Sequence, residues 1–425
     1  MPRIVIAGGG IAGLEALIAL HGHLGSSAEI ELLEANADLV ERQRAVAEPF
    51  GGEPARHFDL VRIVADHGAH LRPDRLASVD PERRTLRTVR GDTLDYDALL
   101  VAVGATPDMA IPGALTFSGP RDVAAFSRLL DDLDAGRAQR VAFALPTSVT
   151  WALPLYELAL MTGEHVRAAG LEHVGLVVVT PEHSPLEAFG TRIASHMWSL
   201  LAERGVAFCG RSVPLRAGPG GLVIAHGEPV QAERIVSLPR FVGPWIGGLP
   251  HDGHGFLATD AHGAVLGTEA VWAAGDGTAF PLKQGGLAAQ QAAAAAAAIA
   301  SALGADVPAA PFRPVLRGLL LDPAGPRFLD STRGDVPTTP LWWPPSKVAA
   351  PHLWGYLAPG AHAVQDESEE IDVGDLLLAL AERHATVGEN ALALRCLDAA
   401  AQVRGALPPE AAARREELAG AHVPS

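Results

Sequence analysis

Apolar residues along the chain gather into runs that alternate between the lengths and spacings of strands and helices. Residues 3–7 form a short apolar run, a glycine turn follows, and residues 11–23 continue with the apolar spacing of a helix. Residues 29–36 begin a second apolar run of strand length. This pattern predicts a βαβ unit with two parallel strands at the start of the chain.

The same pattern returns in the middle of the chain. It predicts a strand over 140–146, a helix over 152–170, a strand over 174–182 and a helix over 191–208. Before this second unit, short apolar runs separated by turn residues over 71–94 predict a small antiparallel excursion. A second βαβ unit indicates a second candidate nucleotide-binding domain.

The remaining segments complete the expected architecture. Residues 269–303 predict a strand, a tight turn and a long alanine-rich helix, and the composition changes near Pro308. At 425 residues the chain exceeds what one core usually organises. We therefore expect an α/β fold with two Rossmann-like dinucleotide-binding domains, the first discontinuous, and a C-terminal region that ends in a helical hairpin. The expected boundaries are 1–115 with 251–308 for the first domain, 116–250 for the second, 309–370 for a capping or interface region and 371–425 for the hairpin tail.

Charge and cysteine content restrict the function. The 49 acidic and 33 basic side chains give a formal net charge of -16, which disfavours nucleic acid as a partner. Cys209 and Cys396 are too few and too far apart in the sequence for a redox pair or a metal cluster, so we expect no metal. We find no export leader and no apolar run of membrane-spanning length, so we expect a cytoplasmic protein without a transmembrane segment.

A glycine motif lies between the first predicted strand and helix. Gly8, Gly10 and Gly13 have the spacing that permits a tight turn, a close approach of the backbone to a pyrophosphate, and close packing of helix on strand. Glu34 follows at the end of the next strand, where a carboxylate can accept hydrogen bonds from ribose hydroxyls. These four residues predict a dinucleotide site.

The chain resembles the two-dinucleotide-domain flavoproteins of the pyridine nucleotide-disulfide oxidoreductase superfamily, because three motifs recur in the same order: GGGIAGLEA, LLVAVGATP and VWAAGDGTAFPLKQGGLAAQQA. The resemblance covers about residues 1–305. It implies FAD bound across the first domain, with Asp276 on the ribityl chain and the helix start after Lys283 near the pyrimidine edge of the flavin. The further flavin contacts that it implies are Leu76, Gly104, Ala105, Gly275, Gln284, Gly285 and Gly286.

Lys283 is one of only two lysines in the chain. Its charge is mildly unfavourable against the dipole of the helix that it precedes, which favours a ligand-facing, catalytic role over that of an ordinary surface lysine. The other candidate catalytic residue is Trp151, which either shields the flavin or fills the core.

The second domain departs from the glycine fingerprint. Pro146 and Thr147 stand where glycines are expected, and this loop resembles the longer nonglycine loop of sulfide:quinone oxidoreductases and flavocytochrome c sulfide dehydrogenases. The redox cysteine that the loop holds in those enzymes is missing here, which argues against sulfide chemistry through a disulfide. Pro146, Thr147, Glu157 and Glu182 remain candidates for an NAD(P) site, with Glu182 in the place of the ribose-binding acid. The alternative is a retained scaffold that binds no nucleotide.

The C-terminal region carries two features of its own. Trp342, Trp343 and Trp354 cluster around prolines, which indicates packing, a quinone-sized pocket or a membrane-surface patch. Lys347 is expected to be a surface lysine or the partner of an acidic ligand group. Residues 373–408 resemble one tetratricopeptide-like hairpin, in which His384 is a packing residue. A single repeat cannot bury its apolar face alone, so it should dock on the parent body, on a second subunit or on another protein.

Two classes of function fit these observations. The first is an FAD-dependent oxidoreductase resembling the sulfide:quinone oxidoreductase and type II NADH dehydrogenase branch, with NAD(P)H as candidate donor and a quinone, a small molecule or a redox protein as acceptor. This first class also includes an enzyme that binds peripherally to the membrane surface. The second is a flavin-binding partner or sensor protein with a degenerate nucleotide domain and a protein-binding hairpin.

Overall fold

The first domain is built on a five-stranded parallel sheet. The computed structural model describes residues 1–149, 151–330, 338, 346–357 and 373–421. The sheet has the order β19-β9-β1-β2-β5. Its strands are β1 (Arg3–Ala7), β2 (Glu29–Leu33), β5 (His70–Arg72), β9 (Ala98–Val101) and β19 (Val271–Ala273). Because β19 joins the sheet beside β9 in parallel register, the first domain is discontinuous in sequence.

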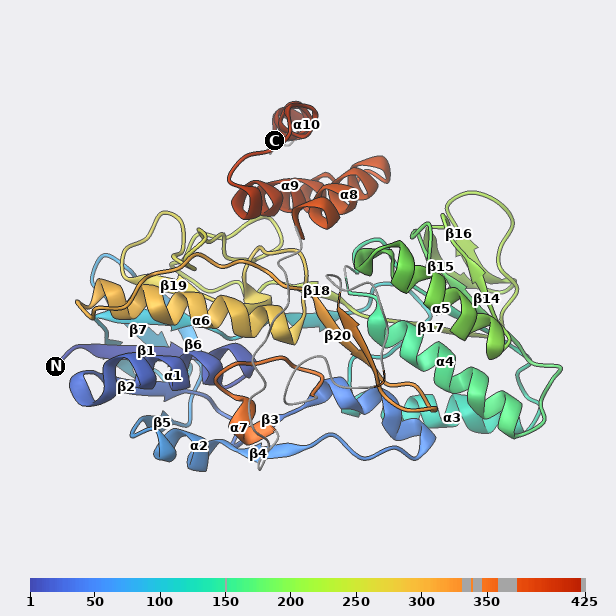
Figure 1. Cartoon of the computed structure of the whole chain (residues 1–425), viewed down its shortest axis with the longest axis horizontal. Coiled ribbons are helices and arrows are strands. Elements are labelled where there is room, and N and C mark those ends of the chain that lie inside the picture. Colours follow the sequence, from blue (N-terminus) through green and yellow to red (C-terminus); the bar gives the residue numbers. More distant parts are fainter. Residues whose placement is uncertain (150, 331–337, 339–345, 358–372, 422–425) are drawn as a thin grey trace.

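Two layers cover this sheet. On one face, α1 (Ile11–Leu24) and α6 (Gly285–Ala302) lie side by side (Figure 1) and share one buried cluster with β1 and β9. On the other face, an antiparallel sheet of β6 (Leu76–Asp80), β7 (Thr85–Thr88) and β8 (Thr93–Asp95) packs Val79 and Leu86 against β1 and β9. This sheet is the predicted antiparallel excursion.

The second domain repeats the plan with the strand order β11-β17-β12-β13-β14. Its strands are β11 (Leu115–Thr116), β12 (Arg140–Ala144), β13 (Gly175–Val179), β14 (Val206–Cys209) and β17 (Arg234–Ser237). The helices α3 (Val123–Asp134), α4 (Leu153–Ala168) and α5 (Thr191–Glu203) bury their apolar faces in one large cluster with the sheet. The ribbon of β15 (Pro214–Gly218) and β16 (Gly221–Ile224) contributes Leu222 to a separate cluster on the opposite face.

One expected helix is shorter than predicted. The helix predicted over 191–208 ends at Glu203, and Val206–Cys209 instead form β14, paired in parallel with β13. Gly205 has a φ of +67°, a conformation that stops a helix and that glycine adopts without steric cost. The apolar spacing of the helix continued through residues 206–208, so the pattern alone concealed this change of direction.

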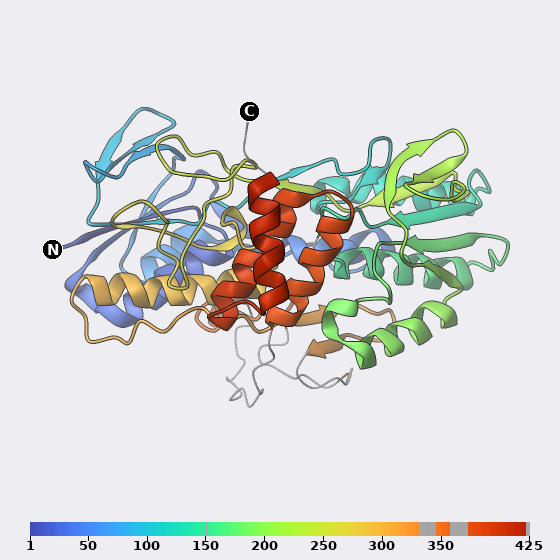
Figure 2. The ribbon, with the colours of Figure 1, turned by 90° about the horizontal axis from the view of Figure 1, so that it is seen from above.

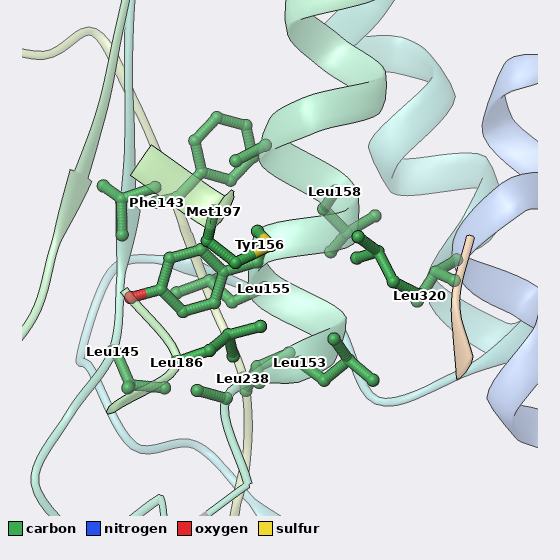
Figure 3. Packing of buried hydrophobic residues seen from close by; sticks show 14 of the residues in the cluster. Phe143, Leu145, Leu153, Leu155, Tyr156, Leu158, Leu186, Met197, Leu238 and Leu320 are labelled. Atoms are coloured by element: carbon green, nitrogen blue, oxygen red, sulfur yellow. The ribbon is translucent and has the colours of Figure 1, made fainter. Parts of the chain in front are cut away.

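The core of the second domain centres on α4. Figure 3 shows the fully buried side chain of Tyr156 among Leu145, Leu186 and Met197, with Phe143 of β12 above it in this view. Leu153 and Leu158 lie on other sides of the same helix, which is therefore buried almost all round. This confirms the expected helix and explains why its sequence is apolar on every face.

Smaller elements connect and cover the two domains. An antiparallel pair, β10 (Thr106–Asp108) with β18 (Arg240–Val242), joins them, and the hairpin of β20 (Arg317–Leu320) and β21 (Arg327–Asp330) lies in the region expected to cap the domains. The remaining helices and strands are β3 (Asp38–Val40), β4 (His57–Asp59), α2 (Leu60–Asp66), α7 (Trp354–Leu357) and the 3₁₀ helices η1 (Gly25–Ser27), η2 (Arg42–Phe50), η3 (Pro120–Asp122), η4 (Glu187–Phe189) and η5 (Gly275–Gly277).

Residues 373–421 of the tail form three helices, one more than the predicted pair. The helices α8 (Val373–Thr386) and α9 (Asn390–Arg404) form the predicted hairpin, and α10 (Pro409–Ala421) packs on α9. Figure 2, seen from above, shows these helices lying over the middle of the molecule, where the two domains meet. Trp342 and Trp343 lie outside the described residues, whereas Trp354 begins α7. Within the described ranges, no helix combines the length and apolarity needed to cross a membrane.

We predict that Gly13→Ala destabilises the first domain. A Cβ atom at residue 13 would lie 1.8 Å from the carbonyl oxygen of Gly8, and because that obstacle is backbone, β1 and α1 would have to separate. The free energy of unfolding should fall by at least about 2 kcal/mol. The matched control is Gly22→Ala in the same helix, where a Cβ meets nothing within 4 Å. That change should raise the stability by roughly 0.5–1 kcal/mol. Equal thermal unfolding of the two variants would contradict this packing.

Candidate functional site

The predicted glycine turn forms an open cradle between β1 and α1. Cβ atoms at Gly8 and Gly13 would collide with backbone, at 2.4 Å from the oxygen of Ala102 and 1.8 Å from the oxygen of Gly8. A Cβ at Gly10, by contrast, would meet no atom of the chain within 4 Å. Gly10 is also the N-cap of α1, and no side chain caps this helix. The open space therefore faces the uncapped N-terminus of a helix, where a pyrophosphate fits.

Glu34 is fixed beside this cradle. Its half-buried carboxylate accepts hydrogen bonds from the Gly9 amide at 2.9 Å and from the Asn36 amide at 2.8 Å. A carboxylate has about four acceptor positions, so ribose hydroxyls can still donate to it. The carboxylate thus lies where the sequence predicts contact with a ribose.

The turn after β19 closes against the end of β9. A Cβ at Gly277 would lie 3.0 Å from the oxygen of Gly104, while a Cβ at Gly104 would meet nothing within 4 Å. Gly275 has a φ of +81°, and its amide donates to the side chain of Gln291 in α6 at 2.8 Å. Asp276 and Ala105 are half-buried on these two neighbouring turns. The structure thus brings together two segments that are 170 residues apart in sequence. Leu76 lies apart from them, at the start of β6, half-buried in the antiparallel layer.

Lys283 is held tightly before the start of α6. Its ammonium group donates to the carbonyl oxygens of Thr278 at 2.6 Å and Phe280 at 2.8 Å, and it lies 4.1 Å from the ring centroid of Phe256. Burial lowers the pKa of Lys283 to about 7, although the nearby charge of Asp276 opposes the shift. Lys283 can therefore gain or lose a proton near neutral pH.

The first turn of α6 is enclosed by other segments. The Gln284 side chain accepts from the Leu287 amide at 2.8 Å and donates to the Arg317 carbonyl of β20 at 3.0 Å. A Cβ at Gly285 would lie 3.0 Å from a methyl group of Val348, and Gly286 is buried. β20 and Val348, which precedes α7, thus pack on the helix start that the family resemblance places beside the flavin.

The atypical loop of the second domain is covered by the tail. Thr147 is buried at the end of β12 with Pro146, and its hydroxyl donates to the carboxylate of Glu389, which precedes α9. Trp151 is half-buried, with its ring centroid 5.7 Å from that of Phe189. Trp151 therefore takes part in packing of the second domain.

Glu157 faces the interior of the molecule. Its buried carboxylate forms an ion pair with the ammonium group of Lys347 and accepts from the Leu321 amide at 2.7 Å. Burial raises the pKa of Glu157 and lowers that of Lys347, and each charge opposes the shift of the other. The sequence favoured a surface position for Lys347, but only 5% of its side chain is exposed. No sequence signal identifies the pair, because its members are 190 residues apart.

Glu182 is also buried, in the interior beyond the end of β13. Its carboxylate accepts from the Tyr156 hydroxyl at 2.5 Å and from the Thr180 hydroxyl at 3.0 Å. Burial raises the pKa of Glu182 to about 7, against the hydrogen bond from Tyr156. The four candidate NAD(P) residues therefore do not form one open surface: Thr147 bonds the tail, and both glutamates have internal partners.

A third buried carboxylate was not predicted. Glu15 lies on α1 and accepts from the amides of His352 at 2.9 Å and Leu353 at 2.8 Å, just before α7. Burial raises its pKa to about 7. A charged residue inside an otherwise apolar helix is the only sequence signal that marks it. Among the described residues, no group of three or more acidic, histidine or cysteine side chains could hold a metal ion.

Comparison with known proteins identifies the family. The model of the pyridine nucleotide-disulphide oxidoreductase family matches residues 2–298. The chain belongs to this family. It is an FAD-dependent oxidoreductase.

Several relatives share this architecture. A demethylphylloquinone reductase of Synechocystis is 25% identical over 305 residues, which cover 65% of this chain and 72% of the relative. The structure of the sulfide:quinone oxidoreductase of Aquifex aeolicus superposes with a TM-score of 0.69 at 17% identity, covering 77% of this chain and 83% of that one. A ferredoxin reductase of Rhodopseudomonas palustris gives a TM-score of 0.59 at 18% identity, with 77% and 82% covered. The two structural likenesses show the shared fold.

We predict that Glu182→Gln changes how stability depends on pH. The pKa of Glu182 is raised from 4.5 to about 7, so its stabilising contribution is fully present below pH 4.5 and is lost as pH rises through about 7. At about 1.4 kcal/mol per pKa unit, the wild type should lose roughly 3 kcal/mol from this group over that range. The glutamine variant keeps an acceptor for Tyr156 and should lack this loss. Urea unfolding measured at several pH values checks it, and parallel stability curves for the two proteins would contradict it.

Proposed function

We propose that this enzyme transfers electrons from NAD(P)H through FAD to a quinone. The observation that carries the proposal is the cradle at Gly10, which is open where Gly8 and Gly13 are closed by backbone. The demethylphylloquinone reductase relative supports a quinone as acceptor. Bound FAD supplies the two-electron chemistry.

The cofactor-binding residues have distinct roles in this proposal. The N-terminus of α1 at Gly10 holds the pyrophosphate, Glu34 accepts from a ribose, and Asp276 accepts from the ribityl chain. Gly104 and Ala105, which follow β9, line the flavin site, and Leu76 borders the adenine. Lys283, together with the helix start formed by Gln284, Gly285 and Gly286, stabilises negative charge at the flavin.

In this proposal the buried pair of Glu157 and Lys347 supplies a proton to the quinone acceptor. The pair lies between α4 and the segment before α7, and the neighbouring Val348 contacts the start of α6. A quinone that takes up two electrons also takes up two protons. Because burial shifts the pKa of each partner toward its neutral form, the pair can hold a proton and donate it where solvent is excluded. The second proton comes from solvent.

A second candidate function is a sensor or binding protein that keeps FAD but carries out no transfer. The observation that favours it is the bond between Thr147 and Glu389, which covers the nucleotide loop with the tail. Transfer of electrons to a quinone separates the two functions.

We predict that Gly10→Val abolishes FAD binding without unfolding the chain. The valine side chain would project into space that no atom of the chain occupies, and Gly10 has a φ of -78°, which valine tolerates. The purified variant should therefore lose the visible flavin absorbance and keep the far-ultraviolet circular dichroism of the wild type. Gly22→Ala in the same helix serves as the control and should retain FAD. Full flavin content in Gly10→Val would exclude this cradle as the pyrophosphate site.

We predict that a quinone reoxidises the reduced flavin and that the buried pair assists it. The protein is reduced with dithionite without oxygen and mixed with a short-chain, water-soluble quinone, so that no nicotinamide is involved. Lys347→Met alone should lose about 3–5 kcal/mol of stability, because Glu157 would remain buried without its partner. The double variant Glu157→Gln with Lys347→Met should recover stability but reoxidise at least about tenfold more slowly.

Two results would count against this prediction. A wild type that no quinone reoxidises would contradict the proposed acceptor. A double variant that is reoxidised at the wild-type rate would show that the pair only joins α4 to the C-terminal region.

A further inference from the structure

The tail hairpin docks on both domains at once. Its inward face, which includes Leu377, Leu380 and Leu397, belongs to the same buried cluster as Phe280 and Phe312 of the segments around α6. Figure 1 and Figure 2 both show α8 and α9 above the junction between the domains. The hairpin therefore covers the interdomain surface and does not extend into solvent.

Polar contacts hold the hairpin along a defined path. Arg383 of α8 pairs with Glu187 in η4 at 2.9 Å, beyond the carboxyl end of β13. Glu389 accepts from Thr147 in the loop after β12. Arg395 of α9 lies 3.6 Å from Asp252 and 4.7 Å from the ring of Phe256, the ring that Lys283 also contacts. The contacts run from β13 across β12 to the start of α6.

A pyridine nucleotide would follow the same path. In a Rossmann-like domain the ligand lies outside the carboxyl ends of the strands, with its pyrophosphate at the turn after the first strand and its ribose acid at the end of the second. These positions correspond here to the loop of Thr147 and the end of β13 near Glu187. The nicotinamide must reach the flavin, which the family resemblance places beside the start of α6.

From this coincidence we infer that the α8–α9 hairpin is a lid that occupies the pyridine-nucleotide cleft of the second domain and must move aside before NAD(P)H reduces the flavin. The inference rests on the proposed NAD(P)H-driven function and adds its regulation. Glu389 takes the place of a phosphate: its carboxylate accepts from Thr147, and its other oxygen lies 2.9 Å from Nδ1 of His384.

The negative charge of Glu389 makes the hairpin a competitor of the nucleotide phosphates. Burial disfavours its ionisation, but the hydrogen bonds from His384 and Thr147 hold its pKa below the usual value. It is therefore ionised at neutral pH and repels an incoming phosphate. A nucleotide must compete with Glu389 for the Thr147 hydroxyl.

The packing below the hairpin is incomplete, which favours its release. A cavity of about 650 Å³ separates α9 and α10 from the first domain. Thr259, Asp260 and Phe312 line it on the first domain, and Gln402 and Arg415 line it on the tail. Across this cavity the side chain of Gln402 donates to the Thr259 carbonyl at 3.5 Å, a longer and weaker contact than those at Thr147 and Glu187.

The test measures binding of NADH and NADPH to the full FAD-loaded chain and to Arg383→Gln. A simple site would bind a polyanionic nucleotide more weakly after loss of a neighbouring cation. A lid predicts the opposite, because loss of the pair with Glu187 frees the cleft. We expect about two- to fivefold tighter binding and a matching fall in the concentration that half-reduces the flavin without oxygen. Glu389→Gln should act in the same direction.

The matched control is Arg414→Gln, which removes the same charge from α10, where Arg414 pairs with Glu417 of its own helix. It should bind like the wild type. Hydrogen exchange gives an independent measurement: adding NAD⁺ to the wild type should increase amide exchange within residues 373–404. This readout does not require turnover.

The results that would overturn the lid differ from those that would overturn the proposed function. Equal or weaker nucleotide binding by Arg383→Gln, or unchanged exchange in the hairpin when NAD⁺ is bound, would overturn the lid while the NAD(P)H donor stands. If no form of the protein binds or is reduced by NAD(P)H, both the lid and the donor fail. The quinone reoxidation experiment, which uses no nucleotide, would still decide the acceptor.

Discussion

The contact between the start of α1 and the end of β1 is the constraint on which the rest of the first domain depends. It exists because Gly13 has no Cβ, so the helix approaches the Gly8 carbonyl more closely than any other residue would allow. This approach aims the N-terminus of α1 at the open space beside Gly10. The neighbouring helix α6 packs on α1, which brings the turn around Asp276 and the segment of Lys283 to the same side of the sheet.

Buried carboxylates fix the positions of the C-terminal segments relative to the two domains. Glu15 joins α1 to the segment before α7, and Glu157 joins α4 to Lys347 and to Leu321, the residue after β20. Each replaces its lost hydration by at least two hydrogen bonds or an ion pair, since an unpaired buried charge would cost several kcal/mol. Such contacts fix segments in register where apolar packing alone would tolerate displacement. They also leave ionisable groups with raised pKa values in the interior of the molecule.

The sequence was most informative where local chemistry decides the structure. The glycine spacing, the apolar strands and the alanine-rich helix predicted both sheets, because each depends on residues close together in the chain. The family resemblance was confirmed by the match over residues 2–298. The end of α5 was missed because one residue, Gly205, interrupts a continuing apolar pattern. The positions of Lys347, Glu15 and Glu389 depend on partners far away in sequence, which no local pattern reveals.

The docked tail offers a physical reason why the loop after β12 lacks the glycines of the dinucleotide-binding fingerprint. A glycine turn offers backbone amides to a diphosphate, whereas the loop at Thr147 offers a hydroxyl, and in this structure a carboxylate of the same chain receives it. An intramolecular carboxylate is present at a high effective concentration, so the Thr147 hydroxyl can bind it without the several donors of a glycine turn. The proposed regulation of nucleotide binding requires a loop that binds phosphate weakly. If the loop bound a diphosphate strongly, the nucleotide would displace the hairpin even at low concentration. The departure from the fingerprint and the docked tail are thus two parts of one arrangement.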